Sequence, residues 1–133
     1  MNYVLDTNIL IEIRKGRRGI KEEVMKFINA ENAEPYITLL TFAEYYFGSL
    51  DASLKGQEDC LEFLSSYKHL TVEKGSAMLF AKLTHKYEKE GTPLSPLDML
   101  NACIAIDNNS VFITADKAFE RVKELKKIII AFS

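Results

Sequence analysis

Acidic residues stand at four comparable places along this chain. Asp6 and Asp116 each come just after a short apolar run of the kind that forms a buried strand. Glu44 lies in the helical pattern after the second such run, and Asp98 opens the helical pattern before the fourth. Because the carboxyl ends of parallel strands meet at one edge of a sheet, these carboxylates can converge there.

Carboxylates that are brought together repel one another, and they cannot all stay ionised unless a cation joins them. Hard divalent ions with oxygen ligands, Mg²⁺ or Mn²⁺, suit such a cluster. His69 precedes a strand and His85 lies inside a long helix, so a zinc site or a histidine general base is disfavoured. The chemistry that fits is hydrolysis of a phosphodiester, which needs metal-binding carboxylates and no serine or cysteine nucleophile.

Each acid also has a purely structural explanation. Asp6 and Asp116 can cap the helices that follow them by accepting hydrogen bonds from free backbone N–H groups. Glu44 can close a capping box with Thr41, and Asp98 can do the same at the start of its own helix. These alternatives stay open for each residue taken alone, and only the convergence of all four favours a metal site.

Strand and helix patterns alternate along the chain. The expected strands are 3–5, 35–38, 70–72, 111–114 and 127–130. The expected helices run from about Asn8 to 13 and then over 20–30, 39–47, 54–66, 74–90, 96–107 and 116–125. No hairpin signal joins consecutive strands, which indicates a parallel sheet with helices on both faces. The expected fold class is α/β, a three-layer α/β/α arrangement with a mostly parallel sheet of four to five strands, and residues 1–133 are expected to form a single domain.

The composition limits the class of protein and the cellular compartment that we expect. The chain has 133 residues, of which 27% are charged and 47% apolar, and this is an ordinary globular composition. The net charge of −2 gives no general attraction to nucleic acid, so any such contact must come from a local patch. Cys60 and Cys103 are isolated and indicate a reducing compartment. With no secretory signal and no apolar run of roughly 18 residues, we expect a soluble cytoplasmic protein.

Four segments, 5–10, 41–44, 97–102 and 113–119, resemble the PIN domain, and the pattern is closest to the small single-domain ribonucleases that are VapC-type toxins of toxin–antitoxin pairs. The resemblance covers essentially the whole chain in the family's order. It implies that the catalytic, metal-binding acids are Asp6, Glu44, Asp98 and Asp116, with Mg²⁺ as cofactor and Mn²⁺ as a substitute. It also implies a supporting role for Thr7, Asn8 and Thr114, the last two through hydrogen bonds that orient carboxylates or water.

One departure from the family pattern concerns Asn101. It stands three residues after Asp98, where the family usually has an aliphatic side chain. At this spacing Asn101 shares a helix face with Asp98, so it either lines the site or satisfies a buried polar contact. The change removes no acid, and we count Asn101 among the supporting residues.

The implied activity is that of an endoribonuclease, the toxin of a type II toxin–antitoxin pair, which cuts RNA to leave a 5′-phosphate. The implied partners are an RNA substrate, an antitoxin whose tail lies across the acidic site, and a second copy of the chain in a homodimer. An RNA-processing PIN nuclease outside a toxin pair and a catalytically inactive PIN-fold binding module remain alternatives. A phosphotransferase with a nucleophilic Asp6 is disfavoured, because Asn8 stands where such enzymes have a second aspartate.

Two further clusters are candidates for binding surfaces. The RNA-binding candidates are the cations around one glycine-containing turn, Arg14, Lys15, Arg17, Arg18 and Lys21, although a solvated turn explains them equally well. Residues 45–47 are three consecutive aromatics, and neighbours on a helix cannot all face one core. We therefore expect at least one of them to meet a partner.

Overall fold

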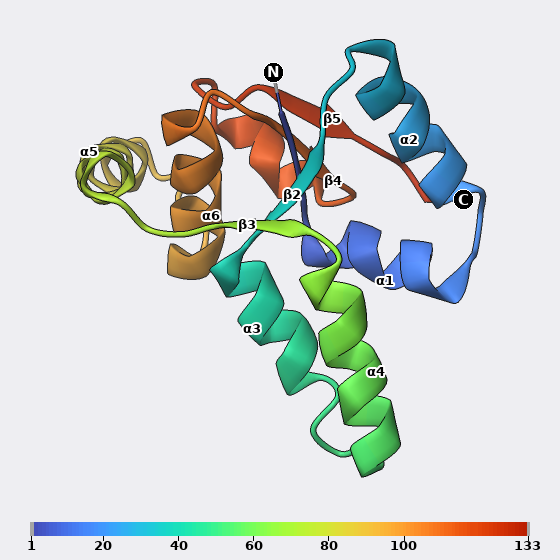
Figure 1. Ribbon diagram of the computed structural model, residues 1–133. Helices are drawn as coiled ribbons and strands as arrows, with labels where there is room; N and C mark the ends of the chain where they lie inside the picture. The colour runs from blue at the N-terminus through green and yellow to red at the C-terminus, as the bar shows by residue number, and fades with distance from the viewer. Residues whose placement is uncertain (1, 133) are drawn as a thin grey trace.

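A five-stranded parallel sheet forms the centre of the molecule. The computed structural model describes residues 2–132 (Figure 1). The strands are β1 (Tyr3–Leu5), β2 (Pro35–Thr38), β3 (Lys68–Leu70), β4 (Val111–Thr114) and β5 (Lys127–Ile129). Their order across the sheet is β3-β2-β1-β4-β5, and all four pairings are parallel. The carboxyl ends of β1, β2 and β4 are therefore neighbours at one edge of the sheet.

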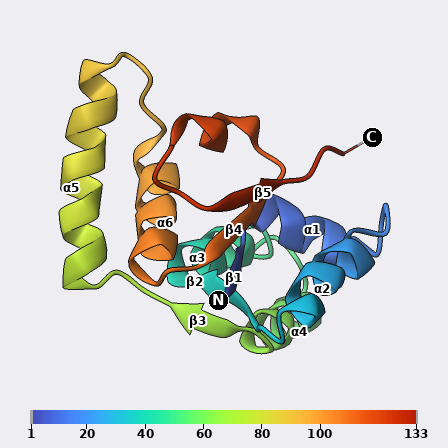
Figure 2. The same cartoon turned by 90° about the horizontal axis from the view of Figure 1, so that it is seen from above.

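Helices cover both faces of this sheet (Figure 2). They are α1 (Thr7–Lys15), α2 (Ile20–Ala30), α3 (Leu39–Phe47), α4 (Leu54–Ser65), α5 (Lys74–Lys89), α6 (Pro96–Asp107) and the short 3₁₀ helix η1 (Lys117–Arg121). Side chains of α1, α2 and α4 pack with Leu5 and Ile113 in one core, whereas those of α5, α6 and η1 pack with Val4 and Phe112 in the other. Successive strand residues point to opposite faces, so both cores draw on the same strands. This confirms the predicted three-layer α/β fold.

Local sequence signals account for several helix boundaries. Ser95 caps α6 by accepting a hydrogen bond from the Asp98 backbone N–H over 3.3 Å, and Pro96 occupies the first helical position. At the end of α1, Gly16 has a φ of 65°, a left-handed conformation that favours glycine. The bounds of α2 and α3 are those that the sequence predicts, and β4 also matches.

Two predicted elements were wrong. The third strand is Lys68–Leu70 and not 70–72, because it pairs with β2 from Tyr36 onward. It is an edge strand whose first two residues are exposed, so an apolar run does not mark it. The segment after β4 forms η1 and not a helix over 116–125. The buried side chains of this segment, Phe119 within η1 and Val122 and Leu125 after it, recur every third residue, whereas an amphipathic α-helix combines three- and four-residue spacings.

Smaller differences concern helix starts. The first helix begins at Thr7, directly after Asp6. The capping box of Thr41 with Glu44 does not form, because α3 begins earlier and its cap is the Thr38 side chain, which accepts from the Thr41 backbone N–H over 3.1 Å. Within residues 2–132, no helix is both long and apolar enough to cross a membrane.

Candidate active site

Asp6 occupies the carboxyl end of the central strand, and only 8% of it is exposed. One carboxylate oxygen accepts a hydrogen bond from the Thr7 backbone N–H over 2.8 Å, so Asp6 does cap α1. The other oxygen accepts from the Thr114 hydroxyl over 2.7 Å and from the Asn8 amide over 3.2 Å. Asn8 in turn accepts from the Ala115 backbone N–H over 2.9 Å. The carboxylate is thus fixed by groups from β1, α1 and the end of β4.

Burial raises the pKa of Asp6 above that of an ordinary aspartate. The hydrogen bonds from Thr114 and Thr7 act in the opposite direction, because they stabilise the ionised form. The charges of Asp98 and Glu44 raise the pKa further. A simple helix cap would not feel two other carboxylates, so Asp6 is both a cap and a member of an acidic group.

Glu44 approaches this edge from α3. Its carboxylate accepts a hydrogen bond from the hydroxyl of Thr7, which ties α3 to the first turn of α1. The side chain is exposed and borders two cavities, described below. Thr7 therefore has a definite partner among the acids, and the two lie 37 positions apart in the chain.

Asp98 lies half-buried in the first turn of α6. Burial raises its pKa, the hydrogen bond with Ser95 lowers it, and the charges of Asp116 and Glu44 raise it again. Asp116 caps η1 through a 2.9 Å hydrogen bond from the Ala118 backbone N–H to its carboxylate. The charges of the other acids thus act on Asp6 and Asp98, so the four lie near one another although they come from separate parts of the chain.

A cavity of about 380 Å³ lies among these acids. Asp6, Glu44 and Asp98 line it, while Asp116 lies beyond its wall. The other lining residues are Leu40, Thr41, Ala43, Phe47, Leu97 and Asn101. Three carboxylates on a partly apolar wall make a site that favours a cation over an anion.

The donor set suits a hard divalent cation, because its oxygens come from carboxylates whose mutual repulsion a cation would relieve. As the side chains stand, no three histidine, cysteine or acidic residues in the described part of the chain are gathered tightly enough to hold an ion. The acids share a cavity, and an ion would have to draw them closer. The residues present fit Mg²⁺ or Mn²⁺ in kind, and which acids bind the ion stays a prediction.

Two threonines under the cavity were not anticipated. Thr38, at the end of β2, donates a hydrogen bond from its hydroxyl to the side-chain oxygen of Asn101. The Asn101 amide nitrogen donates to the Thr41 hydroxyl over 3.4 Å. Asn101 is only 6% exposed, so it both lines the site and satisfies buried polar contacts. A polar residue at the carboxyl end of β2, like Asp6 and Thr114 on their strands, was the sequence signal for Thr38.

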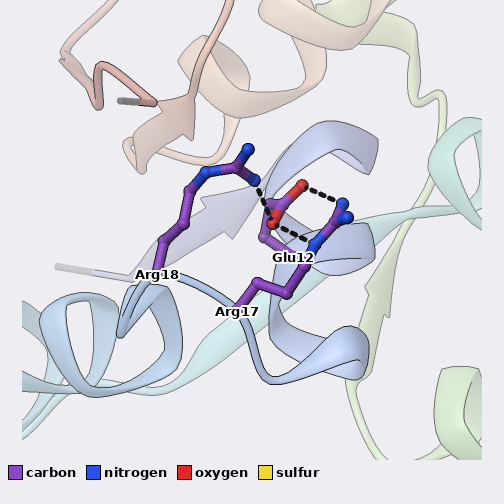
Figure 3. Close-up of polar contacts among 3 residues, drawn as sticks. All are labelled: Glu12, Arg17 and Arg18. Atoms are coloured by element: carbon purple, nitrogen blue, oxygen red, sulfur yellow. Dashed lines mark hydrogen bonds and ion pairs between the residues drawn. The ribbon is translucent and has the colours of Figure 1, made fainter.

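The basic turn between α1 and α2 is organised by Glu12, which is only 5% exposed (Figure 3). Arg17 forms two hydrogen bonds with the Glu12 carboxylate, over 2.7 and 3.0 Å, and Arg18 forms one over 2.7 Å. Arg18 also stacks over the ring of Phe132, with 5.4 Å from its guanidinium carbon to the ring centroid. Two of the five candidate RNA-binding cations therefore have a structural role in the turn.

A second cavity, of about 650 Å³, lies between α1, α3 and α4. It shares Glu44 and Thr7 with the acidic site, and Arg14 and Lys15 stand on its wall. The remaining lining residues are mostly small or apolar: Ile11, Tyr45, Gly48, Ser49, Ala52, Gly56 and Cys60. This groove, as we call it below, continues from the acidic site along α1.

The three consecutive aromatics on α3 do not all face the core, because neighbours on a helix point in different directions. Tyr45 and Tyr46 pack against the core on the α1 side, whereas Phe47 is 76% exposed and forms part of the acidic cavity wall. Leu50 and Leu54, which follow Phe47 in the turn to α4, are exposed too. The tip of the α3–α4 pair, which extends away from the sheet in Figure 1, is thus unusually apolar.

The fold and the acidic cavity together define the class of protein. The PIN domain model matches residues 3–125, and this chain belongs to the PIN domain family. Among its relatives is Ribonuclease VapC1 of Haemophilus influenzae strain R2866, which is 29% identical over 130 residues, covering 95% of this chain and 96% of the relative.

Solved structures show the same fold. The structure of VapBC2 from Rickettsia felis bound to a promoter DNA fragment contains a chain that matches 97% of this one with a TM-score of 0.84 and 24% identity, and 98% of that chain is covered. A chain of VapBC-1 from nontypeable Haemophilus influenzae matches 97% of this one with a TM-score of 0.82 and 24% identity, again over 98% of that chain. These likenesses confirm the predicted architecture.

Proposed function

We propose that this protein is a divalent-metal-dependent endoribonuclease and the toxin of a VapBC-type toxin–antitoxin pair, acting through one nuclease domain. The observation that carries the proposal is the cavity lined by Asp6, Glu44 and Asp98, in which the pKa values of Asp6 and Asp98 are raised by burial and by neighbouring carboxylates. Its similarity to Ribonuclease VapC1 supports RNA as the substrate. All four acids of the family pattern are present, which disfavours an inactive binding module.

The acids and the polar residues around them would have different roles in this reaction. Asp6, Glu44 and Asp98, with Asp116 nearby, would hold Mg²⁺ or Mn²⁺. When bound, the ion supplies Lewis-acid activation of the phosphodiester and of the attacking water. Thr114 and Asn8 hold the Asp6 carboxylate in one orientation, and Thr7 does the same for Glu44. Leu97 and Phe47 form an apolar part of the cavity wall beside the acids.

RNA would approach along the groove, since Arg14 and Lys15 stand there beside Glu44. Lys21 is exposed and can add to the field, whereas Arg17 and Arg18 contribute charge while bound to Glu12. Basic side chains contact the phosphate backbone without regard to sequence, so this surface would supply affinity and not the choice of cleavage site.

An antitoxin segment is proposed to cover the same region. The solved relatives are toxin–antitoxin complexes, and the groove is long, largely apolar and continuous with the acidic site. A peptide seated there would block access to Glu44. The exposed apolar tip of α3 and α4 is the surface that we propose for a homodimer, and we place the protein in the cytoplasm, where RNA substrates are found.

The test is RNA cleavage by the wild type and by Asp98→Asn. Asparagine keeps the size of the Asp98 side chain and its capacity to hydrogen-bond with Ser95, while it removes the negative charge. Total cellular RNA is incubated with Mg²⁺, with Mn²⁺ and with chelator. We expect cleavage by the wild type only with a divalent ion, and at least a hundredfold less by Asp98→Asn.

Glu88→Gln is the matched control, because Glu88 is an exposed acid on α5 that does not line the cavity. It should cut as fast as the wild type. Wild-type protein that cuts no RNA under any of the three conditions, and whose melting temperature Mn²⁺ does not raise, would contradict the proposal and favour a binding module.

A further inference from the structure

Asn101 lies one helical turn beyond Asp98 in the wall of the acidic cavity. Residues three apart on a helix share a face, so the Asn101 amide and the Asp98 carboxylate both border the acidic cavity. The side chain is nevertheless almost fully buried, which places most of its polar surface in contact with protein and not with solvent. Its contacts therefore decide what it does.

Those contacts all lead to the first turn of α3. The oxygen of Asn101 accepts from the hydroxyl of Thr38, and its nitrogen donates to the hydroxyl of Thr41. Thr38 is also the N-cap of α3, since its hydroxyl accepts from the Thr41 backbone N–H. Both threonines are buried, so water does not compete for these bonds.

The consequence concerns two acids on different helices. Thr41 lies one turn before Glu44 on α3, and Asn101 lies one turn after Asp98 on α6. The bonds between Asn101 and the two threonines thus join the helical turns that carry Glu44 and Asp98. No hydrogen bond between those two carboxylates is available to hold them together, because like charges repel, and the charge of Glu44 raises the pKa of Asp98.

We propose that Asn101 is a positioning residue that fixes the spacing of Glu44 and Asp98 across the cavity. The proposal rests on the metal-dependent nuclease function and names a residue through which the site keeps its geometry. An amide suits this place better than a carboxylate, which would add another negative charge to the cavity. An aliphatic residue would take away the acceptor of the Thr38 hydroxyl and leave the two helices joined by apolar packing alone.

The experiment compares Asn101→Leu, Thr38→Val and the double variant with the wild type. Thr38→Val breaks the same hydrogen bond from the other end, so the conclusion does not depend on the folding of one variant. Ile104→Val is the matched control, because Ile104 is a fully buried apolar residue on α6 that does not line the acidic cavity. Four quantities are measured: the melting temperature in chelator, the Mn²⁺ affinity by calorimetry, and kcat and KM for RNA.

We expect Asn101→Leu to bind Mn²⁺ about 10-fold or more weakly and to lose a similar factor in kcat, since residues that orient metal-binding side chains commonly matter by 10–100-fold. The KM for RNA should change by about 2-fold or less, because the phosphate-binding cations are untouched. Thr38→Val should act in the same direction, and the double variant should be no worse than the more affected single variant, as expected for one shared interaction.

Ile104→Val should lower the melting temperature while leaving Mn²⁺ affinity and kcat at wild-type values. If Asn101→Leu and Thr38→Val behave like Ile104→Val, both residues only support the fold and the inference is wrong. The wild type separates this result from a failure of the proposed function. A wild type that neither binds Mn²⁺ nor cuts RNA overturns both, whereas an active wild type leaves the variants to decide.

Discussion

The hydroxyl of Thr114, at the end of β4, donates a hydrogen bond to the carboxylate of Asp6, at the end of β1, although 108 positions separate them in the chain. The bond is possible because β1 and β4 are neighbouring parallel strands whose carboxyl ends coincide. Burial raises the pKa of Asp6, and this hydrogen bond is the largest influence that lowers it. Thr114 therefore orients a buried carboxylate and favours its ionised form.

Replacing Thr114 with valine removes this donor while keeping the shape of the side chain. The variant should lose about 1–2 kcal/mol in the free energy of unfolding, because the Asp6 carboxylate and the Asp116 backbone N–H each lose a partner. The pKa of Asp6 should rise further, so the pH at which Mn²⁺ binding is half lost should move upward. Denaturant unfolding and calorimetry between pH 4 and about 8 measure both effects. An unchanged pH midpoint would show that Thr114 does not tune Asp6.

Replacing Asp98 with asparagine should stabilise the protein when no divalent ion is present. The folded-state pKa of Asp98 is raised by burial first and by Asp116 and Glu44 next, so the ionised form is disfavoured in the folded state. Stability from this group is present below its unfolded pKa and is lost as the pH rises through the higher folded pKa. At pH near 7 the variant should therefore melt about 1–3 °C above the wild type in chelator.

The difference in melting temperature between Asp98→Asn and the wild type should disappear as the pH falls through the raised pKa of Asp98, because wild-type Asp98 then becomes neutral too. Differential scanning calorimetry at a series of pH values across the raised pKa measures this difference in melting temperature. Mn²⁺ should reverse the order of the two proteins at neutral pH, since the ion stabilises only the protein that binds it. A variant that is less stable than the wild type in chelator would contradict the idea that carboxylate repulsion strains this site.

Replacing Glu12 with glutamine should destabilise the turn between α1 and α2. Hydrogen bonds from Arg17 lower the pKa of Glu12, burial acts against them, and Arg18 lowers it further. A depressed folded pKa means that the stabilisation is present above the unfolded pKa and is lost as the pH falls through the folded value. The loss in melting temperature should be larger than for Asp59→Asn, which breaks the exposed Lys55–Asp59 pair on α4. Equal effects of the two variants would mean that the turn does not depend on Glu12.

Replacing Lys15 with alanine should weaken RNA binding and leave folding unchanged. Lys15 is exposed on the wall of the groove, so its loss removes one cation without opening a core. Binding of a labelled RNA in chelator, where no cleavage occurs, should become weaker at every sequence tested, and the salt dependence should drop by roughly one charge. Lys82→Ala on the distant helix α5 is the control and should bind as the wild type does. Equal binding by both variants would remove Lys15 from the RNA-binding surface.

The order of elements and the class of fold followed from the sequence alone. Strands such as Val111–Thr114 are short apolar runs, and α6 begins with a cap, a proline and an acid, so local chemistry fixes where they start and stop. Four acids, two of them after strands and two in helices, predicted one acidic site at the carboxyl edge of the sheet. These patterns are local: the periodicity and caps of each element depend on residues that are close together in the sequence.

Other features needed the tertiary structure. Edge strand β3 is polar, and η1 buries only Phe119, so neither has a reliable pattern in the sequence. The basic turn looked like one surface, but Glu12 draws Arg17 and Arg18 into a structural role and leaves Arg14 and Lys15 on the groove. Which of these cations forms an ion pair depends on which of them the fold places next to Glu12.

The sequence by itself determined which residue types could do chemistry and on which elements they stand. The tertiary structure decided how they are arranged: Asp6, Glu44 and Asp98 line one cavity, while Asp116 stands outside its wall. It also decided that Asn101 bonds with Thr38 and Thr41, more than fifty positions away. Spacing along a chain fixes the face of a helix that a residue occupies, but the partner on the next helix is set by packing between elements, and that information is not local.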